Sequence, residues 1–153
     1  MKMSRNNFGM SFSGLSNIKD SGPKPTVVNI NRIADRNNNY RTALWTGEYL
    51  QLTLMSIPVD GDIGLEVHPD TDQYIRIESG DGLVQLGNSK DNLSFQKKMN
   101  QNDVVFVPAG TWHNVVNIGN SPLKISTVYA PPHHARGTVH KTKEQAESEE
   151  SHH

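Results

Sequence analysis

GDIGLEVHPDTDQYIRIESGDG, residues 61–82, and NDVVFVPAGTWHNVVN, residues 102–117, are the stretches of sequence that decide the fold. Glu66 and His68 stand two residues apart, so on an extended chain both side chains point to the same face. His113 lies on a second strand-like run that follows a Pro-Ala-Gly turn. If these faces line one barrel, four side chains converge in its mouth: Glu66, His68, Gln73 and His113.

Short apolar or alternating segments continue on both sides of these stretches and are separated by turn residues. Leu50–Ile57 alternates between apolar and polar residues, and Val104–Val107 is entirely apolar. About ten short strands at this spacing predict an all-β sandwich or barrel, with one turn expected over Asn31–Arg36. The predicted strands cover residues 26–30, 40–46, 50–57, 65–68, 73–78, 83–86, 93–97, 104–107, 111–117 and 123–129.

A chain of 153 residues has room for one domain with tails. Residues 1–25 are polar and end in a Gly- and Pro-bearing breaker run, which predicts a flexible N-terminal arm; residues 26–130 carry the barrel. Residues 131–153 form a His-bearing segment and an acidic tail, in which Thr142 is expected to cap a short helix or the chain is disordered. We assign no function to His152 and His153, which resemble the start of a purification tag.

Composition excludes several classes of function. The formal net charge of −1 provides no basic field for nucleic acid, so nucleic acid is not an expected partner. The chain has no cysteine, so a metal would need His, carboxylate, amide or water ligands. No apolar run is long enough for a membrane span or a signal peptide, and we expect a cytoplasmic protein that does not bind membranes.

The two quoted stretches resemble the paired motifs of the cupin superfamily. The first motif is a Gly, a His-x-His pair, a Glu and a second Gly; the chain has Gly61, then Glu66 and His68 at the two His positions, Gln73 at the Glu position and Gly80. The second motif has Asn102 in place of its first Gly and matches at the remaining positions, which are Pro108, Gly110, His113 and Asn117. The strand pattern extends the resemblance over about residues 26–130.

The resemblance implies a double-stranded β-helix, or jelly roll, that is commonly a homodimer and holds a metal inside the barrel. It implies no single activity, because cupins include isomerases, dioxygenases, decarboxylases, epimerases and binding proteins. The expected partner is a polar small molecule.

Two of the four ligand positions differ from the family pattern. Glu66 replaces a His and Gln73 replaces a Glu, so the set still carries one carboxylate. Two imidazoles, a carboxylate and an amide oxygen suit one divalent transition metal, Fe, Mn, Ni or Zn. Two alternatives stay open: Glu66 bonds to His68 or Gln73 in a metal-free pocket, or it is a rim carboxylate that pairs with Arg76 or Arg41.

The leading hypothesis is a metal-dependent enzyme, isomerase-like or dioxygenase-like, that acts on a sugar derivative or a keto or hydroxy acid. In it Glu66, if not ligated, would transfer a proton. Arg76, His133 and His134 are candidate substrate contacts. The alternatives are a binding or sensing protein without turnover and a structural dimer with a vestigial pocket.

Overall fold

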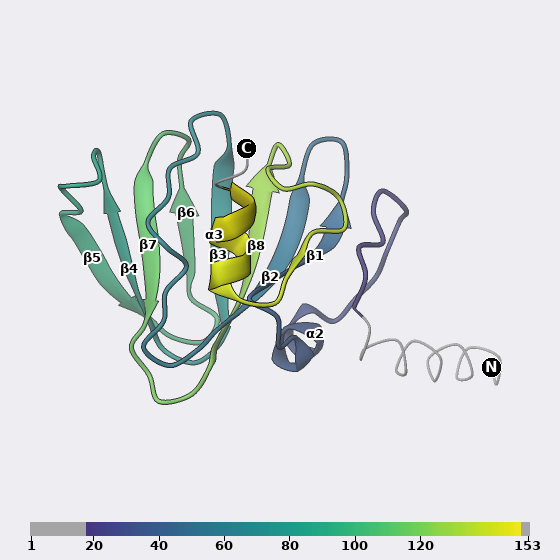
Figure 1. Cartoon of the computed structure of the whole chain (residues 1–153), viewed down its shortest axis with the longest axis horizontal. Coiled ribbons are helices and arrows are strands. Elements are labelled where there is room, and N and C mark those ends of the chain that lie inside the picture. Colours follow the sequence, from purple (N-terminus) through teal and green to yellow (C-terminus); the bar gives the residue numbers. More distant parts are fainter. Residues whose placement is uncertain (1–17, 151–153) are drawn as a thin grey trace.

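Two antiparallel sheets face each other in the computed structural model, which describes residues 18–150 (Figure 1). Most of the predicted N-terminal arm and His152 and His153 lie outside the described residues. The larger sheet has the strand order β6-β3-β8-β2-β1-β9 and the smaller has β5-β4-β7, which confirms an all-β jelly roll. The strands are β1 (Arg41–Thr46), β2 (Gln51–Ile57), β3 (Asp72–Ser79), β4 (Gly82–Gly87), β5 (Phe95–Met99), β6 (Val104–Val107), β7 (Trp112–Asn117), β8 (Leu123–Ala130) and β9 (Val139–His140).

Two predicted strands are absent from the described part of the chain. Residues 26–29 have no regular structure and lead into helix α2 (Ile30–Arg36), where only a turn was expected. Asn29 caps this helix by accepting a hydrogen bond from the backbone N–H of Arg32 at 3.0 Å. Residues 65–68 form no strand, and only Glu66 makes a bridge, to His113.

Asn102 explains one departure from the motif pattern. Its φ of 75° lies in the left-handed region, which Gly adopts freely and Asn tolerates better than most residues. Asn can therefore replace the motif glycine without changing the turn before β6.

The inward-facing side chains divide the interior into two halves. Because side chains alternate along a strand, each of the paired strands β2, β3 and β8 sends every second residue inward. The apolar half is fully buried and consists of Met55, Ile57, Ile75, Ile77, Leu123 and Ile125. The polar half, also buried, consists of Arg41, Gln51, Thr53, Gln73, Thr127 and Tyr129.

The C-terminal segment folds back on the barrel. Strand β9 pairs with β1 and closes that edge of the larger sheet, and helix α3 (Lys143–Glu150) lies across the front of the sandwich (Figure 1). Thr142 caps α3 by accepting from the backbone N–H of Gln145 at 3.1 Å, as predicted. Ala146 packs into the core, and Lys143 forms an ion pair with Asp62. No helix within residues 18–150 is long and apolar enough to cross a membrane.

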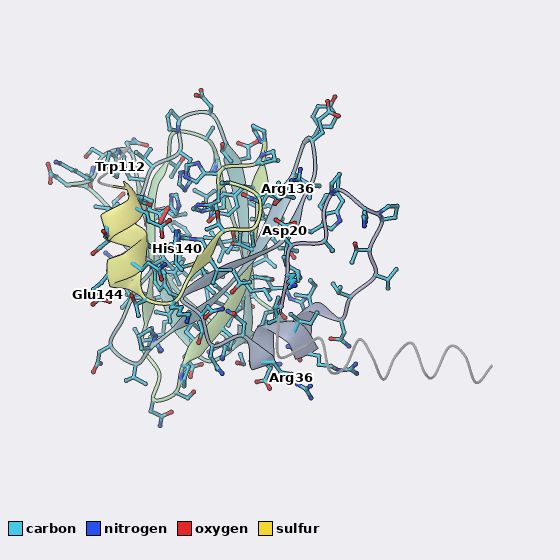
Figure 2. All side chains as sticks on the ribbon, turned by 45° about the vertical axis from the view of Figure 1, so that its right-hand side comes forward. Asp20, Arg36, Trp112, Arg136, His140 and Glu144 are labelled. Carbon is cyan, nitrogen blue, oxygen red and sulfur yellow. The ribbon has the colours of Figure 1, made fainter. Side chains whose placement is uncertain are left out.

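The described end of the N-terminal arm, residues 18–25, is hydrogen-bonded to the barrel. The carboxylate of Asp20 accepts from the Thr46 hydroxyl at 2.5 Å and from the backbone N–H of Gly137 at 3.0 Å. Arg136 donates to the carbonyl of Gly22 at 2.6 Å, and Figure 2 shows Asp20 and Arg136 on the same side of the molecule. These contacts tie residues 20–22 and the loop before β9 to the end of β1.

Candidate metal centre

Backbone pairing places Glu66 directly beside His113. The N–H of each residue donates to the carbonyl of the other at 2.9 Å, so the irregular segment before β3 is held against β7. The carbonyl of His68 accepts from the N–H of Gly110 at 2.9 Å, in the turn that leads to β7. Two motifs distant in sequence are therefore joined through their backbones.

Glu66, His68 and His113, hereafter the Glu-His-His cluster, each present one donor atom, and the three atoms lie within 4.8 Å of one another. His113 is 1% exposed and its Nδ1 donates to the carbonyl of Thr111 at 2.9 Å, if that nitrogen carries the proton. This leaves a lone pair on Nε2, which has no partner, and that is the usual arrangement of a metal-ligating histidine.

The carboxylate of Glu66 lies between two cationic or potentially cationic groups. Its Oε2 is 3.0 Å from Nε2 of His68, and its Oε1 is 3.7 Å from a terminal nitrogen of Arg41. Burial raises the pKa of Glu66, but the contact with His68 and the charge of Arg41 outweigh it, so the pKa lies below its usual value. Burial lowers the pKa of His113, which keeps its imidazole neutral at pH 7.

Gln73 projects inward from β3 and is buried. Its Nε2 donates weakly to the hydroxyl of Thr127 at 3.5 Å, whereas its Oε1 has no partner. Oε1 of Gln73 and Nε2 of His113 are thus buried at this end of the barrel without a hydrogen-bond partner, and Nε2 of His68 has the Glu66 carboxylate beside it at 3.0 Å. Buried polar atoms normally have partners, so these atoms fit a bound cation.

His133 and His134 follow β8 and cover the site. The ring of His133 lies 4.2 Å from that of His68 and 4.7 Å from that of His134, measured between centroids. Burial, together with the charge of Arg41, lowers the pKa of His134 to about 2. Burial lowers the pKa of His133 as well, so both rings are neutral at pH 7.

Arg76 points away from the cluster. It donates to the side-chain oxygen of Asn102 at 2.9 Å, and its Nε lies 3.6 Å from Glu78. The arginine that approaches Glu66 is Arg41, the other partner considered from sequence.

No site role was predicted from the sequence for Gln51, and Arg41 was considered only as a partner of a rim carboxylate. Both side chains are buried. The sequence offers one sign of such buried polar residues: each lies near the start of a predicted strand, residues 40–46 or 50–57. That signal is weak, because strands of a half-exposed sheet carry polar residues at alternate positions.

The fold is a jelly-roll barrel with two histidines and a carboxylate at one end that could hold a metal ion. The family model described as a cupin domain matches residues 53–129, and the chain therefore belongs to the cupin family.

Two similar proteins extend this result over most of the chain. The uncharacterized protein YrkC of Bacillus subtilis is 58% identical over 129 residues, which cover 84% of this chain and 69% of YrkC. The crystal structure of BH2720 from Bacillus halodurans is 55% identical with a TM-score of 0.85, covering 86% of this chain and 99% of that one.

A more distant solved structure shares the fold alone. The formate complex of oxalate decarboxylase from Lactobacillus farciminis has a TM-score of 0.52 at 24% identity, covering 57% of this chain and 26% of that one.

Proposed function

We propose that this cupin binds one divalent transition metal at the Glu-His-His cluster, with Gln73 as a fourth ligand. The observation that carries the proposal is the pair of buried atoms without partners, Oε1 of Gln73 and Nε2 of His113, at the Glu-His-His cluster. Leaving such an atom unpaired costs about 1–3 kcal/mol, and a bound cation would remove that cost.

The ligand set indicates which metals fit. Two imidazole nitrogens and two oxygens suit Fe, Mn, Ni or Zn better than Ca or Mg, which prefer oxygen ligands alone. The lowered pKa of Glu66 keeps its carboxylate ionised, as a ligand must be. Thr111 fixes the ring of His113 through its carbonyl, which orients Nε2.

We further propose that the site acts on a polar small molecule, as an isomerase or a dioxygenase. A bound metal would supply Lewis-acid polarisation of a carbonyl or hydroxyl oxygen. The buried polar wall of Thr53, Thr127 and Tyr129 offers hydroxyls that would orient such a ligand, and the His133 ring packs against that of His68. If Glu66 is not ligated, its carboxylate is placed to accept a proton.

A second candidate is a protein that binds or senses a small molecule without turnover. The contacts of Glu66 with His68 and Arg41 support it, because they stabilise the carboxylate without a metal. The homodimer remains an expectation from the family resemblance, and the cytoplasmic location remains an expectation from the sequence.

Elemental mass spectrometry of the full chain tests the metal centre. The protein is reconstituted with Fe, Mn, Ni or Zn, dialysed, and compared with a His68→Ala/His113→Ala variant. We expect close to one metal per chain in the parent and a loss of at least about tenfold in the variant, since two of its ligands are removed.

A His152→Ala/His153→Ala variant is the matched control, because it also removes two histidines but none from the barrel. Circular dichroism of every metal-free protein shows whether the fold is retained. Equal metal content in the parent and the His68/His113 variant would overturn the proposed centre. If the parent alone retains metal, activity screens with the loaded parent separate an enzyme from a binding protein.

A further inference from the structure

Arg41 is a buried cation with an incomplete set of partners. Its side chain is nearly inaccessible, yet its Nε has no hydrogen-bond partner. One terminal nitrogen contacts Nδ1 of His140 at 3.1 Å, and the other lies 3.7 Å from Glu66, beyond a direct hydrogen bond. A guanidinium has five N–H donors, so its side facing the cluster can still bind an acceptor.

The balance of charges at the site indicates whether that acceptor is neutral or negatively charged. A divalent cation and Arg41 bring three positive charges into the barrel, and Glu66 is the one carboxylate within ion-pair distance of Arg41 among the described residues. Two positive charges are then left uncompensated in a buried setting, where the cost of an unpaired charge is high. An anionic ligand would compensate for them.

His140 and Glu149 hold the guanidinium in place. Because Nδ1 of His140 faces an arginine, which only donates, it must be an acceptor, and its proton lies on Nε2. That nitrogen is 3.2 Å from a carboxylate oxygen of Glu149 on α3. Figure 2 shows His140 beside this helix.

These three residues come from β1, β9 and α3, outside residues 53–129 matched by the family model. The arrangement therefore lies outside the part of the chain that the family model matches. It places the guanidinium of Arg41 beside the cluster from outside the two motifs.

We infer that the site takes a small carboxylate, with one oxygen toward the Glu-His-His cluster and the other on the Nε–H side of Arg41. The inference rests on the proposed metal centre and specifies its ligand class. A planar carboxylate matches the planar donor fork of arginine, whereas a neutral sugar would leave the charge of Arg41 uncompensated.

Titration of the zinc-loaded full chain with malonate and with malonamide, its neutral counterpart, tests the inference. Zinc is diamagnetic, so the Nε–H signal of Arg41 is observable by NMR and is assigned by its loss in Arg41→Lys. We expect malonate to shift this signal and to bind saturably by calorimetry, and malonamide to do neither. Arg41→Gln should weaken malonate binding by at least about tenfold, the loss of one charge-assisted contact.

Arg32→Gln is the matched control, because Arg32 is an exposed arginine on α2 and should keep the parent affinity. Equal binding of malonate and malonamide, or a malonate affinity that Arg41→Gln and Arg41→Lys leave unchanged, would overturn the inference. If Arg41→Gln does not fold, the Nε–H shift of the parent decides. Failure to retain zinc would instead contradict the proposed metal centre. In that case, Arg41-dependent binding of malonate to the metal-free parent would still support the anion site.

Discussion

The side-chain amide of Gln51 forms hydrogen bonds with both the backbone N–H and the backbone carbonyl of His134. The side-chain Nε2 of Gln51 donates to the carbonyl of His134 at 2.9 Å, and its Oε1 accepts from the N–H of His134 at 2.9 Å. The same oxygen accepts from the N–H of His133 at 3.2 Å. A fully buried amide on β2 thus fixes the loop that places both imidazoles over the cluster.

Gln51→Ala should therefore loosen this loop and lower the stability of the protein. The change leaves partly buried backbone groups of His133 and His134 without their partner, and we expect the free energy of unfolding to fall by about 1–2 kcal/mol. Urea unfolding measures the loss, and hydrogen exchange should be faster at His133 and His134. Gln96→Ala, at an exposed position on β5, is the control, and equal effects of the two changes would contradict the assigned role.

Ile125→Ala should destabilise the fold without affecting the metal centre. Ile125 is fully buried in the apolar half of the interior, so its truncation leaves a cavity that costs about 2–5 kcal/mol. Ile118→Ala, at a residue 45% exposed, should cost no more than about 0.5 kcal/mol. Urea unfolding and metal analysis of both variants check this, and a loss of metal in Ile125→Ala would show that the two halves are coupled.

Asp20 should stabilise the protein in a pH-dependent way. Burial raises the pKa of Asp20, but hydrogen bonds from Thr46, Gly137 and Gly22 outweigh it, so the pKa of the folded state is below that of the unfolded state. Such a carboxyl stabilises the fold fully above its unfolded pKa of about 3.9, and the contribution is lost as the pH falls through the lower, folded value.

Urea unfolding of Asp20→Asn between pH 7 and pH 3 tests this. The difference from the parent should be largest near pH 7 and should shrink below about pH 4. Asp91→Asn, at an exposed position, should show no such trend. A difference that is constant over the whole range would mean that the charge of Asp20 is not involved.

Metal binding should raise the melting temperature. At a free metal concentration of 100 times Kd the stabilisation is about 2.7 kcal/mol, or about 5–10 °C for a domain of this size. Calorimetry with added Zn or Ni should show the shift in the parent but not in His68→Ala/His113→Ala. A shift of the same size in both proteins would place the metal elsewhere.

The fold and the centre of the site could be predicted because their signals are local. Strand alternation, the turn residues and the spacing of His68, His113 and Asn117 are all properties of short stretches of sequence. The helix over Ile30–Arg36 was predicted only as a turn, since seven residues with two of them buried give little periodicity. Residues 65–68 were predicted as a strand because their alternation resembles one, although their pairing is limited to a single bridge.

The surroundings of the site were not predictable because they depend on pairing between distant segments. Arg41 contacts His140 only because β9 pairs with β1, with Arg41 opposite His140. Gln51 reaches His134 only because β2 pairs with β8, with Gln51 opposite Tyr129. No short-range pattern in the sequence encodes either pairing.

The division of the interior into an apolar and a polar half has a consequence for how such a protein can change over time. The hydrophobic contacts that stabilise the fold lie on Ile75, Ile77 and Ile125, whereas the proposed ligand positions include Glu66, Gln73 and His113. A substitution at one end is therefore expected to leave the packing at the other end intact. Glutamate at the histidine position, Glu66, and glutamine at the glutamate position, Gln73, could therefore have arisen in separate steps during evolution. Neither step would require a compensating mutation in the apolar core.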